Sequence, residues 1–352
     1  MKPKVNVTLR DIALKLDVSI VTVSKALRDH PDISHTTSQL VKQTALEMGY
    51  MANFMARNLS SNKSYTIGLV VPKVAHHFFS TLIESVYDTA FENNYEIILT
   101  VSQENENREL KHIQTLLSMR VDGLIVSLSE HTRNYSIFEY VRNSGIPLVF
   151  VDRALEMPKF SSITVDDRGG TFMAIEHAIK MGYTKIGHLG GFKEIFIGRR
   201  RYQGFKDAME KYDLDINPDW VVFGGFSEKD GYEGFKKIYN SGSIPEFIFA
   251  VTYPVALGIY TAAAELKLRI PEDIDIICFG NNTTSRFISP ALSCVDQPAD
   301  KLGRRAVEVI LEDIGSNDRT RPRHIEVPTK LIIRETCSAK NKIAKPKKLV
   351  YP

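Results

Sequence analysis

The stretch that decides the fold is residues 8–27, TLRDIALKLDVSIVTVSKAL. In its first half, the apolar residues stand at positions i, i+3, i+4 and i+7, which is the spacing of one helix face. These residues are Leu9, Ile12, Ala13 and Leu16. Thr8 can cap the start of this helix, with Asp11 as its partner in a capping box. The pattern therefore predicts a short amphipathic helix that begins after Thr8.

A second short helix is predicted after the polar break at residues 17–19, because Ser19 is a favourable N-cap. Val23, Ala26 and Leu27 share its inner face. The residues that point outward are Ile20, Val21, Thr22, Ser24 and Lys25. They suit a DNA major groove, in which hydroxyls bind phosphates, methyl groups contact thymine, and lysine contacts guanine or phosphate. The alternative interpretation is an ordinary amphipathic helix pair.

This helix pair resembles the DNA-binding head of LacI/GalR-type bacterial transcription regulators, which opens with a pattern close to VTLxDIAxxxxVSxxTVSxxL. The chain has VTL at residues 7–9, DIA at 11–13, VS at 18–19 and TVS at 22–24. The resemblance continues through IGLVVP at residues 67–72 and, more loosely, to about residue 337. It implies a repressor that binds operator DNA as a homodimer. We expect Thr8 and Ser19 to join the outward residues in contacting DNA.

A third helix is predicted between residue 34 and Gly49, which completes a helix-turn-helix domain at residues 1–50. Residues 51–64 are predicted to form a hinge helix and linker, and a helix this short forms only against a partner. The resemblance implies minor-groove contacts from Asn53, Ala56 and Leu59, and Leu59 suits an apolar wedge between base steps. The chain departs from the family at Ala52, where proline is usual. A plain interdomain linker is the alternative.

From residue 65 onward, apolar runs of strand length alternate with helical stretches, which predicts an α/β fold of parallel sheets with helices on both faces. The predicted strands are 67–71, 96–101, 123–127, 147–151, 162–165, 185–189, 220–223, 247–251 and 274–279. The resemblance implies a two-lobed periplasmic-binding-protein-like domain at residues 65–337, for effector binding and dimerisation. Lobe 1 would be about 65–163 and 296–323, and lobe 2 about 164–295 and 324–337. Residues 338–352 are predicted to be a disordered basic tail.

Composition and length restrict the class of protein. A chain of 352 residues with 43% hydrophobic content is long enough for two or three domains. It has no apolar run of about 18 residues and no signal-peptide core, so we expect a cytoplasmic, nucleoid-associated protein. Cys278, Cys294 and Cys337 are expected to be buried thiols. Because metal-ligand spacings, a P-loop and a GxSxG motif are missing, we expect no metal, cofactor or enzyme activity.

The net charge of +3 is distributed unevenly along the chain. Residues 1–63 hold nine Lys/Arg against five Asp/Glu, and residues 339–352 hold five Lys and no acidic residue. The remaining residues therefore carry a net charge of −6. A basic head on an acidic body fits a protein that meets a polyanion with one end.

Candidate ligand contacts follow the predicted strands, because parallel sheets bind ligands at the carboxyl ends of their strands. Asp152 and Arg153 follow one strand, and a carboxylate beside a guanidinium can bind paired hydroxyls or an anionic group. The resemblance implies that an aromatic residue near 75–79 packs on the effector and that Arg201 contacts it. The full set is His77, Phe78, Phe79, Asp152, Arg153, Asp166, Arg201, Tyr253, Asn281 and Gln297. The alternative for each is a surface polar group or loop salt bridge.

Many sugar-sensing relatives have Asn-Asp before Pro-Val-Ala, whereas this chain has Thr252 and Tyr253. The difference removes an acceptor for vicinal hydroxyls and adds a ring for stacking. A saccharide or a derivative is still the expected effector, with a non-sugar ligand or no ligand as alternatives. The predicted function is an effector-controlled transcription repressor with no membrane partner. A solute-binding receptor without regulatory DNA binding and an enzyme on a doubly wound fold are the alternatives from other classes.

Overall fold

The computed structural model describes residues 7–50, 63–316 and 321–337. It separates into two units, Met1–Ser64 and Tyr65–Pro352. The predicted hinge contacts Asn53, Ala56 and Leu59, and the predicted tail at 338–352, lie outside the described residues.

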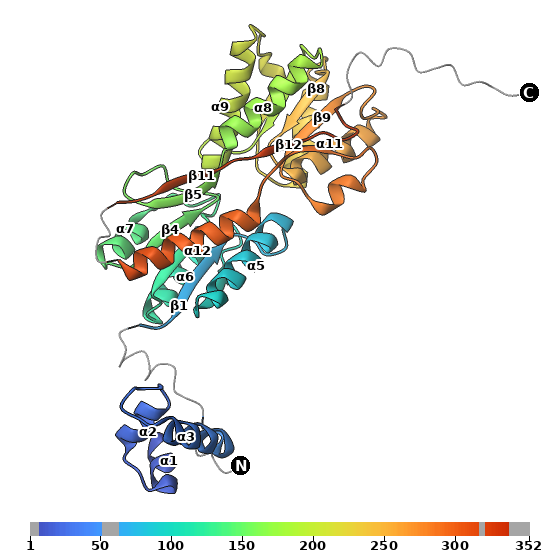
Figure 1. The fold of residues 1–352 in the computed structure, drawn as a ribbon. Coiled ribbons are helices and arrows are strands. Elements are labelled where there is room, and N and C mark those ends of the chain that lie inside the picture. The colour runs from blue at the N-terminus through green and yellow to red at the C-terminus, as the bar shows by residue number, and fades with distance from the viewer. Residues whose placement is uncertain (1–6, 51–62, 317–320, 338–352) are drawn as a thin grey trace, which may run out of the picture. The chain divides into compact units, whose positions relative to one another are not determined.

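Three helices form the N-terminal unit: α1 (Leu9–Leu16), α2 (Ile20–Ala26) and α3 (His35–Met48) (Figure 1). Each begins at a hydroxyl N-cap, Thr8, Ser19 or Ser34, whose side chain accepts a hydrogen bond from the backbone N–H three residues later. Gly49 ends α3 in the left-handed conformation, with φ of 70°. The buried core residues are Ile12, Ala13, Val23, Ala26, Val41 and Ala45. The predicted helix-turn-helix fold is confirmed.

The first sheet of the body has the spatial order β11-β5-β4-β3-β1-β2, and all its strands are parallel. Its strands are β1 (Thr66–Val71), β2 (Glu96–Val101), β3 (Gly123–Val126), β4 (Leu148–Val151), β5 (Ser161–Val165) and β11 (His324–Val327). One face packs against α5 (His77–Glu92) and α12 (Ala299–Gly315), which lie side by side in Figure 1. The other face packs against α6 (Glu106–Ser118) and α7 (Ser136–Asn143). These elements form lobe 1.

The second sheet has the order β12-β10-β9-β8-β6-β7, with only β12 antiparallel to its neighbour. Its strands are β6 (Ile186–Gly190), β7 (Val221–Phe223), β8 (Phe247–Ala250), β9 (Asp275–Phe279), β10 (Ser293–Asp296) and β12 (Lys330–Ile332). The helices α8 (Asp167–Lys180) and α9 (Phe196–Lys211) cover one face, and α10 (Glu228–Asn240) and α11 (Tyr253–Glu265) cover the other. Short 3-10 turns, η1 (Pro218–Trp220) and η2 (Thr283–Arg286), complete lobe 2.

The chain passes between the lobes three times, after β5, after β10 and between β11 and β12. The predicted assignment of residues 324–327 to lobe 2 is wrong, because His324 pairs with Ser162 and the whole of β11 belongs to lobe 1. In this edge strand exposed residues alternate with half-buried ones, so the sequence lacks the apolar run that predicts a buried strand. Consequently lobe 1 extends to Val327, and the passage lies at residues 328–329.

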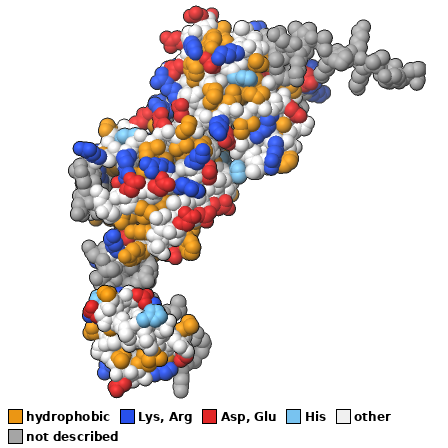
Figure 2. All heavy atoms as spheres, in the orientation of Figure 1, with side chains coloured by type: hydrophobic (Ala, Val, Ile, Leu, Met, Phe, Trp, Pro, Cys, Tyr) orange, Lys and Arg blue, Asp and Glu red, His pale blue; other side chains and the backbone are white. Residues whose placement is uncertain are grey.

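All nine predicted strands are present, whereas β10, β11 and β12 were not predicted. Cys278, Cys294 and Cys337 are buried free thiols, as expected. Within residues 7–50, 63–316 and 321–337, each helix is too short or too polar to cross a membrane. On the face of the body seen in Figure 2, basic and acidic side chains are interspersed rather than gathered into a patch of one sign.

Candidate DNA-reading helix and ligand cavity

The helix α2 has one buried face and one exposed face. Val23 and Ala26 are fully buried, whereas Ile20 and Val21 are 47% and 64% exposed. Both exposed side chains lie in the first turn, the part of a recognition helix that reaches base edges in helix-turn-helix proteins. The arrangement therefore presents branched aliphatic groups where a DNA-reading helix presents its specificity residues.

The polar residues proposed to contact DNA already have partners in the head. Thr8 donates its hydroxyl to Asp11 at 2.7 Å and its backbone N–H at 2.8 Å, and these hydrogen bonds lower the pKa of Asp11. The hydroxyls of Ser19 and Thr22 share a hydrogen bond of 2.8 Å. The remaining contacts are Arg28 donating to Ser24, and Lys25 paired with Asp32 at 2.6 Å.

A cavity of about 350 Å³ lies between the two lobes of the body. It is lined by elements that begin at the carboxyl ends of parallel strands, the position where doubly wound folds bind ligands. Nine of the ten residues selected from the sequence line it: His77, Phe78, Phe79, Asp152, Arg153, Arg201, Tyr253, Asn281 and Gln297. The size is within the range of small-molecule sites.

Asp166 is the exception, because it does not line this cavity. Its side chain caps α8 by accepting a hydrogen bond from the Gly169 N–H at 2.8 Å, and it lines a different, shallow depression with Arg168 and Asp207. The next residue, Asp167, is fully buried. The helix cap and the buried carboxylate are adjacent in sequence, and only their side-chain directions distinguish them.

Arg201 is held by partners inside lobe 2. It is 1% exposed, its Nε donates to Asp167 at 2.8 Å, and its Nη1 donates to the Val251 carbonyl at 2.6 Å. Its guanidinium carbon lies 3.7 Å from the centre of the Phe279 ring. Burial raises the pKa of Asp167 to about 7, against the opposing charge of Arg201. The charge of Arg201 is thus balanced within its own lobe.

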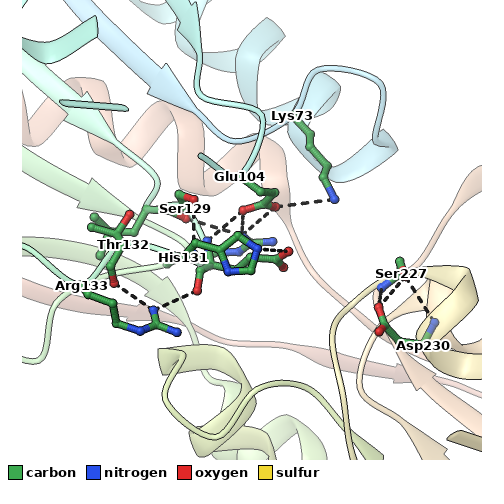
Figure 3. Close-up of polar contacts among 11 residues, drawn as sticks. Lys73, Glu104, Ser129, His131, Thr132, Arg133, Ser227 and Asp230 are labelled. Carbon is green, nitrogen blue, oxygen red and sulfur yellow. Dashed lines mark hydrogen bonds and ion pairs between the residues drawn. The ribbon is translucent and has the colours of Figure 1, made fainter. Parts of the chain in front are cut away.

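Arg153 has the corresponding arrangement in lobe 1. Its Nη1 donates to both oxygens of Glu104 at 2.9 and 2.8 Å, and both side chains are buried. Glu104 also lies 3.6 Å from Lys73 and accepts from the Glu130 N–H. Burial raises the pKa of Glu104, but the charge of Arg153, the hydrogen bonds from the Glu130 N–H and Arg153, and the charge of Lys73 together lower it below its ordinary value. Figure 3 shows Glu104 between Lys73 and the loop that carries Ser129 and His131.

Asp152 differs from these paired groups. It is 4% exposed and lines the cavity, and its carboxylate has no hydrogen-bond partner among the described residues. Burial raises the pKa of Asp152 to about 6, although Arg153 and Arg201 lower it. Its φ of 63° is left-handed, a conformation that non-glycine residues adopt mostly at constrained positions. The cavity therefore contains a buried acceptor that faces its interior.

Several cavity residues were not selected from the sequence. Phe226, which lies in a loop before α10, has its ring centre 5.4 Å from the Arg153 guanidinium across the two lobes. Phe279 ends β9 two residues before the predicted Asn281, so its position at a strand end could have identified it. Cations also line the cavity: Lys73, Lys301 and Lys330.

The fold and the two sites define a class of protein: a helix-turn-helix DNA-binding head joined to a two-lobed ligand-binding body. Comparison with known families agrees with this class. Residues 8–53 match the bacterial regulatory proteins of the lacI family, and residues 175–337 match the periplasmic binding protein-like domain. The HTH-type transcriptional repressor PurR of Haemophilus influenzae (strain PittEE) is 32% identical over 333 residues, covering 94% of this chain and 98% of the relative.

PurR of Pasteurella multocida (strain Pm70) is also 32% identical, over 95% of this chain and 99% of the relative. Among solved structures, the lac repressor dimer bound to operator and the anti-inducer ONPF superposes with a TM-score of 0.84 at 23% identity, over 94% and 99% of the two chains. A transcriptional regulator CelR–cellobiose complex gives 0.72 at 22% identity, over 94% and 100%. The chain belongs to the LacI family of bacterial regulatory proteins. It is a DNA-binding transcriptional repressor and not an enzyme.

Proposed function

We propose that this repressor works as a homodimer whose operator affinity is controlled by a saccharide, or a saccharide derivative, bound in the cavity between the lobes. The DNA contacts in this proposal are Thr8, Ser19, the outward residues of α2 (Ile20, Val21, Thr22, Ser24 and Lys25) and the hinge residues Asn53, Ala56 and Leu59. Such a repressor acts at the chromosome, which assigns it to the cytoplasm and the nucleoid. Because the head belongs to a family of regulatory proteins, a solute receptor without DNA binding is not retained as an alternative.

The ligand proposal rests on how the buried ionisable side chains that line the cavity are paired. Arg153 is paired with Glu104, and Arg201 is paired with Asp167, which leaves Asp152 as a buried carboxylate without a paired cation. An unpaired carboxylate favours hydrogen-bond donors and repels an anion. The part of the cavity next to Asp152 therefore suits a neutral group rich in hydroxyls.

The walls of the cavity supply apolar faces for the ring of such a ligand. Phe79, Phe226, Tyr253 and Phe279 all line it, and aromatic faces pack well against the C–H surface of a sugar ring. The Tyr253 hydroxyl shares a hydrogen bond of 2.7 Å with Thr284, so its ring is fixed in position. The lysines elsewhere in the cavity leave room for an anionic substituent on the same ligand.

Ligand control requires that the two lobes respond to occupancy. Both lobes contribute to the cavity, with Asp152 on lobe 1 and Arg201 and Tyr253 on lobe 2. A ligand that contacts both lobes binds the closed arrangement more tightly than the open one, which shifts the population toward closure. Because β1 of lobe 1 directly follows the segment that leads from the head, a change in lobe 1 can alter how two heads are presented to an operator.

The test compares Asp152→Asn with the matched control Asp166→Asn in the full-length protein. Calorimetric titration with a panel of pentoses, hexoses, disaccharides and their phosphates identifies a saccharide that binds. Gel-shift assays with genomic DNA fragments that the protein selects then measure how this saccharide changes the affinity for DNA. Loss of a hydrogen bond to a charged acceptor weakens binding by about 10- to 100-fold in Asp152→Asn. Asp166→Asn retains a good helix cap and should bind like the natural protein.

The pH dependence gives a second readout of the same site. Since the pKa of Asp152 is about 6, the carboxylate becomes protonated as pH falls through this value, and affinity for the ligand declines. Asp152→Asn should lack this decline. A panel in which no saccharide binds, or a binder that Asp152→Asn leaves unaffected, would contradict the saccharide proposal.

A further inference from the structure

The first turn of α2 presents aliphatic side chains to solvent. Ile20 and Val21 are the first two residues of the helix, and neither contributes to the buried core of the head. The opposite face is already filled by Val23 and Ala26. Exposed branched aliphatic side chains are unfavourable in water, so covering this surface with an apolar group lowers the free energy.

The polar side chains of the same helix are engaged within the head. Ser19 and Thr22 bond to each other, and Ser24 accepts from Arg28. Lys25 is paired with Asp32. Hydrogen bonds from these groups to base edges would compete with contacts that already exist, whereas the two aliphatic side chains have no such competition.

We propose that this repressor recognises its operator mainly through thymine methyl groups, which Ile20 and Val21 contact in the major groove. The proposal rests on α2 being the helix that reads DNA. Thymine is the only common base with a methyl group at C5, and this group projects into the major groove, where apolar side chains can contact it. The expected half-site therefore has thymines opposite the start of α2, and hydrogen bonds to purine edges have a smaller part in specificity.

Replacement of thymine by uracil tests this directly, because it removes the methyl group and preserves base pairing. Full-length protein first selects its site from a library of random duplexes. The selected duplex is then synthesised with deoxyuridine in place of one thymidine at a time, and affinity is measured by fluorescence anisotropy at fixed salt concentration. Loss of one buried methyl contact should weaken binding about fourfold, and replacement in both half-sites of a palindrome about 15-fold.

Protein variants identify which side chain meets which methyl group. For Ile20→Ala and Val21→Ala, the ratio of the affinities for the thymine and uracil duplexes should approach one at the base that the missing side chain contacted. At the other positions, replacing thymine by uracil should weaken binding as much as it does in the natural protein. Leu14→Ala is the matched control, because Leu14 is also exposed, at 72%, but lies on α1. Alanine is a favourable helix residue, and circular dichroism checks that each variant is folded.

The outcomes separate this proposal from the proposed function. If the protein selects a specific sequence but binds its uracil forms equally well, methyl recognition is wrong and repressor function is unaffected. If the uracil effect is present but persists in both alanine variants, Ile20 and Val21 do not contact the methyl groups and this inference is wrong. If the protein selects no sequence at all, both the proposed function and this inference fail.

Discussion

Replacement of Arg201 by methionine distinguishes a structural arginine from a ligand contact. The family resemblance implies that Arg201 binds the effector, yet the structure commits its Nε to Asp167 and its Nη1 to the Val251 carbonyl. Arg201→Met keeps the length of the side chain and removes both hydrogen bonds. It also leaves Asp167, which is fully buried, without its cation.

These contacts determine the expected loss in the free energy of unfolding. Loss of one partner from a buried ion pair destabilises a protein by about 3–5 kcal/mol, because the other charge stays buried and unpaired. This is a large share of a typical stability of about 5–15 kcal/mol. Adding Asp167→Asn removes the orphaned charge, so the double variant should regain part of the loss. Arg199→Met is the matched control, since its exposed pair with Glu156 is worth about 1 kcal/mol or less.

Urea unfolding followed by tryptophan fluorescence provides the assay, because the single tryptophan, Trp220, lies in lobe 2 with Arg201. The destabilisation of Arg201→Met should be nearly constant below about pH 7 and should increase as pH rises above this value. Burial already raises the pKa of Asp167 to about 7 and loss of the arginine raises it further, so above about pH 7 the folded variant keeps a proton that the folded natural protein and the unfolded state both release. A cost below about 1 kcal/mol together with complete loss of effector binding would refute this reasoning.

Two further predictions concern His188 and Asp32. His188 is fully buried among aromatic rings, and neither ring nitrogen has a hydrogen-bond partner within the described residues, so His188→Phe should raise stability by about 1 kcal/mol at pH 7. Burial lowers the pKa of His188 to about 3, so below about pH 6.5 the unfolded state binds a proton that the folded state does not. In urea unfolding, the stability advantage of the variant should therefore grow by about 1.4 kcal/mol for each pH unit that the pH falls below this value. An advantage that stays constant with pH would contradict this expectation. Asp32→Asn should free Lys25 for a phosphate, raising affinity for specific and random duplexes alike and steepening the logarithmic salt dependence by about 0.9 per half-site. Salt titrations with unchanged slopes would show that Lys25 makes no such contact.

Local signals explain why the head could be predicted from the sequence. The three N-caps, the apolar spacing of α1 and the glycine after α3 each act within one or two helical turns. The long parallel strands were predictable for a similar reason, since buried strands are continuous apolar runs. By contrast, β11 and β12 have polar, half-exposed residues, and their pairing with distant strands determines their structure.

The ligand cavity was predictable where it follows from topology. Residues that follow parallel strands converge at one edge of a sheet, which is why Asp152 and Asn281 could be chosen from their positions alone. Partner choice is a different matter, because it depends on side-chain directions between distant segments. The pairing of Arg201 with Asp167 rather than with a ligand, and of Arg153 with Glu104, has no signal in the local sequence.

The separation of these pairs between the lobes bears on the proposed control by a ligand. Glu104 and Arg153 both belong to lobe 1, and Asp167 and Arg201 both belong to lobe 2, so each lobe neutralises its own buried charge. Opening the cleft therefore leaves neither pair broken.

Among the described residues, the ion pairs that cross between the lobes are Arg199 with Glu156 and Arg200 with Glu326, all partly exposed. Such pairs contribute about 0–1 kcal/mol each. With only these exposed ion pairs joining the lobes, a ligand with a few kcal/mol of preference for the closed form can change which form predominates. If the buried pairs had instead spanned the cleft, opening would have exposed unpaired charges, and the lobes would have been fixed together whether or not a ligand was bound.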